Sequence, residues 1–171
     1  IRAGDRQALR RVFLQHYPQL CRTADRYLSA EAMQAEDLVQ EVFARFWHRR
    51  DRLQVHTSLG AYLHRMTVNE AISYLRKQKK WQTEELDPAR ESGSVVAPSG
   101  EEQLAASDLQ QQIDRALQRL PLRCRTVFLL SRKDRLSYKE IAEQLEISVK
   151  TVENQMGKAL RIMREELNEY L

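Results

Sequence analysis

The chain has 171 residues, of which 30% are charged, a formal net charge of +4, and only five glycines and four prolines. This length accommodates one medium domain or two small ones, and no apolar run is long enough to span a bilayer, so we expect no membrane insertion. Because glycine and proline are scarce and no strand-like alternation occurs, the sequence predicts an all-α protein.

Charge is distributed in three blocks. Residues 1–82 carry 15 Lys/Arg against 8 Asp/Glu, residues 83–106 carry 1 against 6, and residues 107–171 carry 12 against 10. Two cationic blocks around an acidic one indicate two nucleic-acid-facing modules. The acidic block contains prolines, glycines and few apolar residues, which is typical of a flexible linker. We therefore expect two small helical domains, 1–82 and 107–171, joined by a flexible acidic linker at 83–106.

The first helical pattern runs from Asp5 to about Leu28, and Pro18 is expected to kink or break it. A second pattern covers about 33–49 and contains the segment AEDLVQEVFARFW, in which apolar residues cover more than one face beside an acidic and polar patch. This helix is either the centre of its bundle or partly a surface for a protein partner, and periodicity alone favours the centre.

The third helical pattern spans about 61–80 and has a basic outer strip. The strip comprises Arg65, Asn69, Arg76, Lys77 and Lys80, with Tyr62, Tyr74 and Trp81 near it. Basic residues interleaved with aromatic rings suit unstacked nucleic acid, whose bases can stack on the rings. A solvated helix end is an equal alternative.

After the acidic block, Leu109, Ile113, Leu117 and Leu120 predict one helix, and Pro121 suits the first turn of the next. The buried candidates of that second helix are Cys124, Val127, Phe128 and Leu130. Cys21 and Cys124 lie far apart within apolar patterns, so free thiols are favoured over a disulfide.

The segment from Leu136 to Arg164 predicts a helix-turn-helix. Ser137 and Glu140 form a capping box, Glu146-Ile147-Ser148 makes the turn, and Ser148 suits the N-cap of the second helix. The positions of that helix expected to face the core are Val149, Val152, Met156, Ala159 or Leu160, and Met163. The residues left outside, suited to base edges and phosphates, are Lys150, Thr151, Glu153, Asn154, Gly157, Lys158 and Arg161.

Gly157 is unusual in the middle of a helix, where glycine costs about 1 kcal/mol relative to alanine. Either the missing side chain lets the backbone approach DNA, or it permits close packing on a neighbouring helix. The sequence does not choose between these alternatives.

Together these segments resemble the extracytoplasmic-function (ECF) group of bacterial sigma factors over nearly the whole chain. AEDLVQEVFARFW resembles region 2.2, AYLHRMTVNEAISYLRK resembles regions 2.3 and 2.4, and the stretch from Leu120 to Leu160 resembles region 4. The resemblance implies a subunit that binds core RNA polymerase and directs it to promoters.

The resemblance also implies site residues and partners. Those implied to dock on the clamp helices of the polymerase β′ subunit are Asp37, Gln40, Glu41, Phe43 and Trp47. Those implied to bind the −10 element, with one extruded base, are Gln54, Thr57, Ser58, Tyr62, Arg65, Asn69, Arg76, Lys77 and Lys80. The outer residues of the second helix-turn-helix helix, with Ser148, would enter the −35 major groove, and this domain would touch the β flap. An anti-sigma factor is a further implied partner, and the cytoplasm is the implied location.

The chain departs from the family pattern at three positions. Ser73 stands where many members carry Asp, Tyr62 where many carry Trp, and Glu146 replaces the glycine common in such turns. These departures concern promoter sequence and turn geometry rather than the class of protein.

Two other classes are alternatives. A LuxR-type regulator, which binds duplex DNA as a dimer without polymerase, has a similar helix-turn-helix, but the N-terminal half lacks a βαβ receiver pattern. An enzyme is disfavoured because the four histidines lack metal-ligand spacing and no phosphate loop or nucleophile motif occurs. We therefore expect no catalytic residues, no metal and no cofactor.

Overall fold

The computed structural model describes residues 5–28, 35–52, 58–78, 81 and 106–168, and every element in these residues is helical. The chain divides into two compact units, Ile1–Lys77 and Gln78–Leu171. The all-α prediction is therefore confirmed. Apart from its last residue, the expected linker at 83–106 lies outside the described residues, and the domain boundaries stay a prediction.

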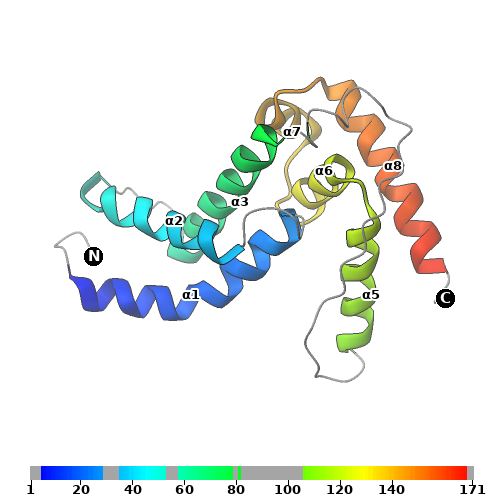
Figure 1. Cartoon of the computed structure of the whole chain (residues 1–171). Coiled ribbons are helices and arrows are strands. Elements are labelled where there is room, and N and C mark those ends of the chain that lie inside the picture. Colours follow the sequence, from blue (N-terminus) through cyan, green and yellow to red (C-terminus); the bar gives the residue numbers. More distant parts are fainter. Residues whose placement is uncertain (1–4, 29–34, 53–57, 79–80, 82–105, 169–171) are drawn as a thin grey trace. The chain divides into compact units, whose positions relative to one another are not determined.

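The first unit contains α1 (Arg6–Tyr27), α2 (Ala35–His48), the short 3-10 helix η1 (Arg50–Arg52) and α3 (Leu59–Lys77). Each of the three α-helices packs against the other two, as the blue, cyan and green ribbons of Figure 1 show. Their shared core includes Tyr27, Leu38, Val39, Val42, Phe46, Leu63 and Leu75. The side chain of Asp5 begins α1 by accepting hydrogen bonds from the backbone N–H groups of Gln7 and Ala8 at 2.8 and 3.1 Å.

Pro18 does not break α1, which continues to Tyr27. A proline removes one backbone hydrogen bond from a helix, yet here its side chain is exposed and the following residues Leu20, Ala24 and Tyr27 are buried. Packing of these residues against α2 and α3 offsets the lost bond.

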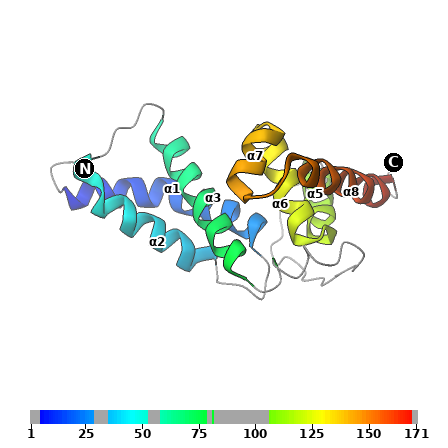
Figure 2. The same ribbon diagram turned by 90° about the horizontal axis from the view of Figure 1, so that it is seen from above.

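The second unit contains α5 (Ala106–Arg119), α6 (Leu122–Arg132), α7 (Tyr138–Leu145) and α8 (Val149–Asn168). Helix α8 packs against the other three, and Figure 2 shows α8 beside α5 and α6. Pro121 serves as the N-cap residue of α6, in accord with its expected place at the helix start. The core includes Leu120, Cys124, Val127, Leu130, Ile141, Met156 and Ala159.

Trp81 also belongs to the second unit, where it is buried at 4% exposure. The guanidinium carbon of Arg123 lies over its ring at 4.7 Å from the centroid. Trp81 is therefore a core residue here, and its ring is not exposed for stacking on bases as the sequence pattern predicted.

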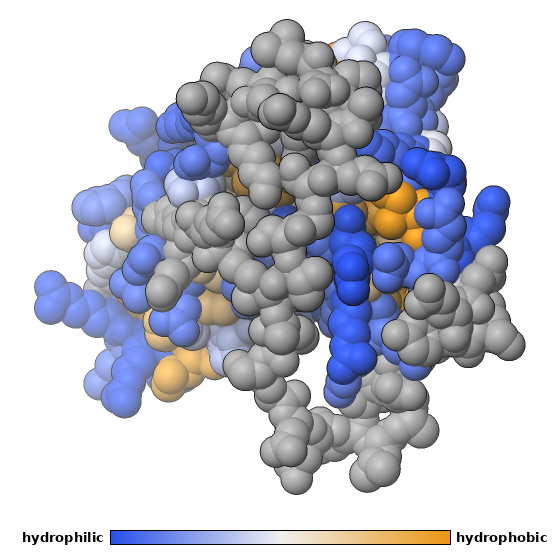
Figure 3. Space-filling view, turned by 45° about the vertical axis from the view of Figure 1, so that its right-hand side comes forward, coloured by the Kyte–Doolittle hydropathy of each residue, from blue (hydrophilic) through white to orange (hydrophobic). Residues whose placement is uncertain are grey.

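Exposed apolar side chains are scattered. The large ones among the described residues are Leu14, Tyr138, Val149 and Leu160. On the face in Figure 3 the described surface is mostly hydrophilic, with separate hydrophobic areas. None of the described helices has the length and hydropathy of a membrane span.

Candidate nucleic-acid and polymerase interfaces

The helix-turn-helix is formed by α7 and α8. The capping box is present: Ser137 Oγ accepts from the Glu140 N–H at 3.3 Å, and Glu140 Oε2 accepts from the Ser137 N–H at 2.8 Å. Ser148 Oγ accepts from the Thr151 N–H at 3.0 Å, so Ser148 caps α8 as expected. Because this hydroxyl also hydrogen-bonds the Thr151 hydroxyl at 2.8 Å, both side chains are held at the start of α8.

The turn between these helices depends on Glu146, which has a positive φ of 55°. Its conformation lets the Ile147 N–H donate to the Ala142 carbonyl at 3.0 Å, which satisfies a carbonyl at the end of α7. A glutamate thus occupies the left-handed position that glycine adopts more readily.

One side of α8 is buried and the other is polar. Val152, Met156, Ala159 and Met163 are buried, and the open alternative at 159 or 160 is resolved because Leu160 is exposed. Val149 was expected to face the core, but it is 42% exposed. It is the first residue of the helix, three positions before the first buried residue, Val152.

The polar side carries a stripe of four residues at spacings of four, three and four. These are Lys150, Asn154, Gly157 and Arg161, and all are exposed. The stripe is hereafter called the reading stripe. It lies opposite the buried residues of α8, so it is available to a groove that admits one helix. Glu153 lies at one edge of the stripe, and the half-buried Thr151 and Lys158 lie at the other.

Gly157 sits in the middle of the reading stripe. No atom lies within 4 Å of the position that a Cβ would take, beyond the helix itself and the neighbouring residues. Close packing on another described helix therefore does not account for this glycine. The space beside the Gly157 Cα is open and faces outward.

Helix α8 is also tied to α6 through a polar contact. The Cys124 thiol lies 2.8 Å from the side-chain oxygen of Gln155, to which it donates. Both cysteines are free thiols, as expected. Gln155 is half-buried and lies between the buried side of α8 and the edge formed by Thr151 and Lys158, so this contact adds a polar link between α6 and α8.

In the first unit, α2 presents an acidic face. Asp37, Gln40 and Glu41 are exposed, as a surface for a partner requires. The other face is buried, which confirms the core interpretation of the apolar residues. The Asp25 side chain on α1 is exposed, but partial desolvation of its carboxyl, and then the neighbouring Glu36 carboxylate on α2, raise the pKa of Asp25.

Two of the residues expected to contact polymerase, Phe43 and Trp47, are less exposed than the other three. Phe43 is buried at 6% exposure and its ring lies 4.8 Å from that of Phe13, so its expected direct contact with polymerase is not supported. Its ring fills the space between α2 and α1 instead. Trp47 is half-buried beneath the Arg50 guanidinium, whose carbon is 4.7 Å from the ring centroid.

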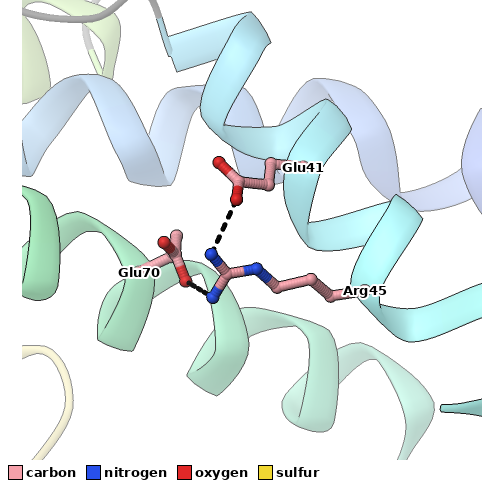
Figure 4. A network of polar contacts seen from close by, with 3 residues as sticks. All are labelled: Glu41, Arg45 and Glu70. Atoms are coloured by element: carbon pink, nitrogen blue, oxygen red, sulfur yellow. Dashed lines mark hydrogen bonds and ion pairs between the residues drawn. The ribbon is translucent and has the colours of Figure 1, made fainter. Parts of the chain in front are cut away.

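Arg45 links the acidic face to α3. Its guanidinium contacts Glu41 Oε1 at 2.6 Å and Glu70 Oε2 at 2.5 Å (Figure 4). Glu41 lies on the same helix and Glu70 on α3, so one arginine fixes the carboxylate of Glu41 and bridges the two helices.

The basic strip of α3 is present in part. Arg65, Asn69 and Lys77 are exposed, whereas Tyr62 and Arg76 are half-buried. The Tyr62 ring is 6.3 Å from the Phe46 ring, so part of it serves the core. Of the other expected −10 residues, Ser58 is exposed, and Gln54, Thr57 and Lys80 lie outside the described residues.

A cavity of about 260 Å³ adjoins the start of α3. It is lined by His16, Gln19, Leu20, Ser58, Gly60, Ala61 and His64. Of these, only Ser58 was expected as a site residue. Sequence periodicity could not find His16 and Gln19, because they come from α1, some forty residues away.

Gly60 makes room for this arrangement. A Cβ at residue 60 would lie 3.0 Å from His16 Cε1. A methyl group at residue 60 would therefore have to push the imidazole of His16 back by a few tenths of an ångström.

Comparison with known proteins identifies both units. The Sigma-70 region 2 family matches residues 12–80, and the Sigma-70 region 4 family matches residues 110–163. The ECF RNA polymerase sigma factor SigW of Bacillus subtilis is 29% identical over 80% of this chain and 76% of its own length. SigE of Mycolicibacterium smegmatis is 31% identical over 92% of this chain and 59% of its own.

A solved structure supports the fold. The sigma factor RpoE of Bartonella quintana, in complex with the anti-sigma factor NepR, covers 96% of this chain and 99% of its own, with a TM-score of 0.55 and 23% identity. The region 2 match makes the LuxR-type interpretation wrong. Sigma factors are not enzymes; they direct promoter recognition by RNA polymerase. The chain belongs to the ECF sigma factors, with one region 2 domain and one region 4 domain.

Proposed function

We propose that the second unit inserts the reading stripe of α8 into the major groove of the −35 element. This proposal rests on one observation: the reading stripe lies on the side of α8 opposite to its buried residues. Asn154 would read a base edge, while Lys150, Lys158 and Arg161 would hold phosphates or bases. Glu153 borders the same surface, and Ser148 and Thr151 lie at its first turn.

The first unit would bind the −10 element along α3. Arg65, Asn69, Arg76 and Lys77 would hold the backbone, and Ser58 and Tyr62 would lie near an extruded base. Gln54, Thr57 and Lys80 remain proposed on the resemblance alone. Extruding a base costs a few kcal/mol of stacking and pairing, so these protein contacts have to compensate.

The acidic face of α2 would dock on the β′ clamp helices of core RNA polymerase. Asp37, Gln40 and Glu41 are exposed, the two carboxylates carry the charge for such a contact, and the half-buried Trp47 would lie beside them. The second unit would contact the β flap, with residues 83–106 running between the two docking points. Since transcription initiation in bacteria occurs in the cytoplasm, we expect the protein to act there.

An anti-sigma factor is a further proposed partner. RpoE of Bartonella quintana is described with the anti-sigma factor NepR, and a second structure of similar fold is CnrH in complex with the cytosolic domain of CnrY. A partner of this kind would cover the DNA-binding or polymerase-binding faces and hold the protein inactive.

The test is reconstitution with core RNA polymerase, followed by sequencing of the transcripts made. We expect initiation from a defined promoter set. Asn154→Ala should change the −35 preference, whereas Lys158→Ala should weaken all promoters and make the salt dependence shallower. If Asn154→Ala weakens every −35 sequence equally, its proposed base-reading role is wrong. If the chain does not bind core polymerase, the whole proposal fails.

A further inference from the structure

We propose that Glu153 selects a cytosine in the −35 element, so that this sigma factor requires a C·G pair at one position of that element. The inference rests on the proposed insertion of α8 into the major groove. It begins from an unusual feature: a carboxylate stands beside the reading stripe of a helix that has to approach the negatively charged DNA backbone.

The Glu153 side chain is exposed at the edge of the reading stripe, where it can reach a base. Its exposed fraction is 46%, and its Oε2 lies 3.3 Å from Lys150 Nζ, one turn earlier on α8. A surface pair of this kind contributes little to folding. A role in stability therefore does not explain the carboxylate.

The chemistry of the major groove limits what a carboxylate can recognise. A carboxylate only accepts hydrogen bonds, whereas guanine presents two acceptors and thymine presents one acceptor and a methyl group. The donors are the amino groups of cytosine and adenine. The adenine amino group stands beside the N7 acceptor, which repels a carboxylate, so cytosine is the base that fits best.

Lys150 makes this approach possible. Its ammonium group neutralises the carboxylate before binding, and it is itself 77% exposed on the reading stripe. In the complex the same ammonium group would contact a phosphate. Lys150 thus contributes to affinity by reducing the repulsion between Glu153 and DNA, and Glu153 determines specificity.

The experiment uses holoenzyme assembled from core RNA polymerase and the full chain, with a promoter library randomised across the −35 element. The wild type should show one position at which a cytosine, on one strand or the other, is required. Glu153→Gln should reduce that preference by roughly tenfold and shift it toward adenine, because an amide both donates and accepts. A wild type with no such position, or a Glu153→Gln variant that keeps the cytosine preference, would overturn the inference.

Two controls separate specificity from affinity. Glu165→Gln removes another exposed carboxylate of α8, one that pairs with Arg161 at 3.6 Å, and it should leave the −35 preference unchanged. Lys150→Met should weaken all promoters but keep the cytosine preference. Loss of the preference in Glu165→Gln, or its replacement by another base in Lys150→Met, would count against the assignment. Holoenzyme that starts at no defined promoter would instead refute the proposed function, and with it this inference.

Discussion

Arg123 contacts Trp81 through both its backbone and its ring, although 42 positions separate the two residues. The Nε of Arg123 donates a 2.8 Å hydrogen bond to the Trp81 carbonyl, while the guanidinium lies over the indole ring. Both side chains are buried, at 3% and 4% exposure. The ring and the carbonyl together solvate a charge that would otherwise be costly to bury.

Trp81→Ala should therefore destabilise the second unit by about 3 kcal/mol or more, since it removes a large buried ring and one partner of a buried charge. Hydrogen exchange of the α6 amides measures this directly. Trp47→Ala is the control, because Trp47 lies in the first unit and should affect α2 instead. Unchanged exchange in α6 of Trp81→Ala would show that the contact does not contribute to stability.

Glu146→Gly should stabilise the second unit by about 1 kcal/mol, because glycine adopts a positive φ without the steric cost that a glutamate carries. Thermal unfolding is the measurement. The matched control is Glu143→Gly, an exposed position inside α7, where glycine should instead cost about 1 kcal/mol. Equal effects of the two substitutions would contradict the role assigned to the left-handed residue.

Gly157→Ala should raise the stability of α8 by about 1 kcal/mol, because a methyl group there meets no other atom and alanine favours the helix. The same methyl would fill the hollow in the reading stripe, so promoter affinity should fall. Unfolding and promoter-binding titrations check the two effects. Leu160→Ala, at an exposed residue of α8 outside the stripe, should leave binding as it was. A Gly157→Ala protein that binds promoters normally refutes the DNA-approach explanation.

Glu41→Gln and Glu70→Gln separate polymerase binding from helix packing. Each removes one of the two ion pairs of Arg45, so each should cost the fold no more than about 1 kcal/mol. Only Glu41 lies on the proposed polymerase face. We expect Glu41→Gln to weaken binding to core polymerase by roughly tenfold and Glu70→Gln to leave it nearly unchanged. Equal losses would assign the effect to the Arg45 bridge.

Asp25→Asn should stabilise the first unit at neutral pH. Partial desolvation raises the pKa of Asp25, so the folded protein holds this proton more tightly than the unfolded chain does. The favourable contribution of the protonated form is present at low pH and is lost as the pH rises through the raised pKa. The difference in unfolding midpoint between variant and wild type should therefore grow with pH above about 4. A difference that does not depend on pH would contradict this assignment.

The sequence predicted what depends on local pattern. The capping box of Ser137, the turn at Glu146 and the buried side of α8 from Val152 onward follow from spacing along one segment, and all are present. Contacts between distant segments were not predictable in this way. Trp81 looked like part of a surface strip because its partner Arg123 lies in another helix. For Phe43, periodicity favoured the core and only the family resemblance implied contact with polymerase; its packing on Phe13 of α1 agrees with the periodicity.

The same distinction between local pattern and tertiary contact applies to the candidate sites. The exposure of Asp37, Lys150 and Asn154 follows from helical periodicity, whereas the pairing of Glu153 with Lys150 needed side-chain positions. The cavity beside α3 had no signal in the sequence, since α1 supplies His16, Gln19 and Leu20. Residues from distant segments that meet only through tertiary packing leave no common periodic pattern in the sequence.

Positions 16 and 60 are consequently coupled. The contact between the imidazole and the bare Cα means that Gly60→Ala alone must displace the ring, while the same change combined with His16→Ala has space to fit. The two substitutions should thus be non-additive, the double variant being less impaired than the sum of the single ones. In relatives that carry a larger residue at the start of this helix, we expect a smaller one at the facing position of the first.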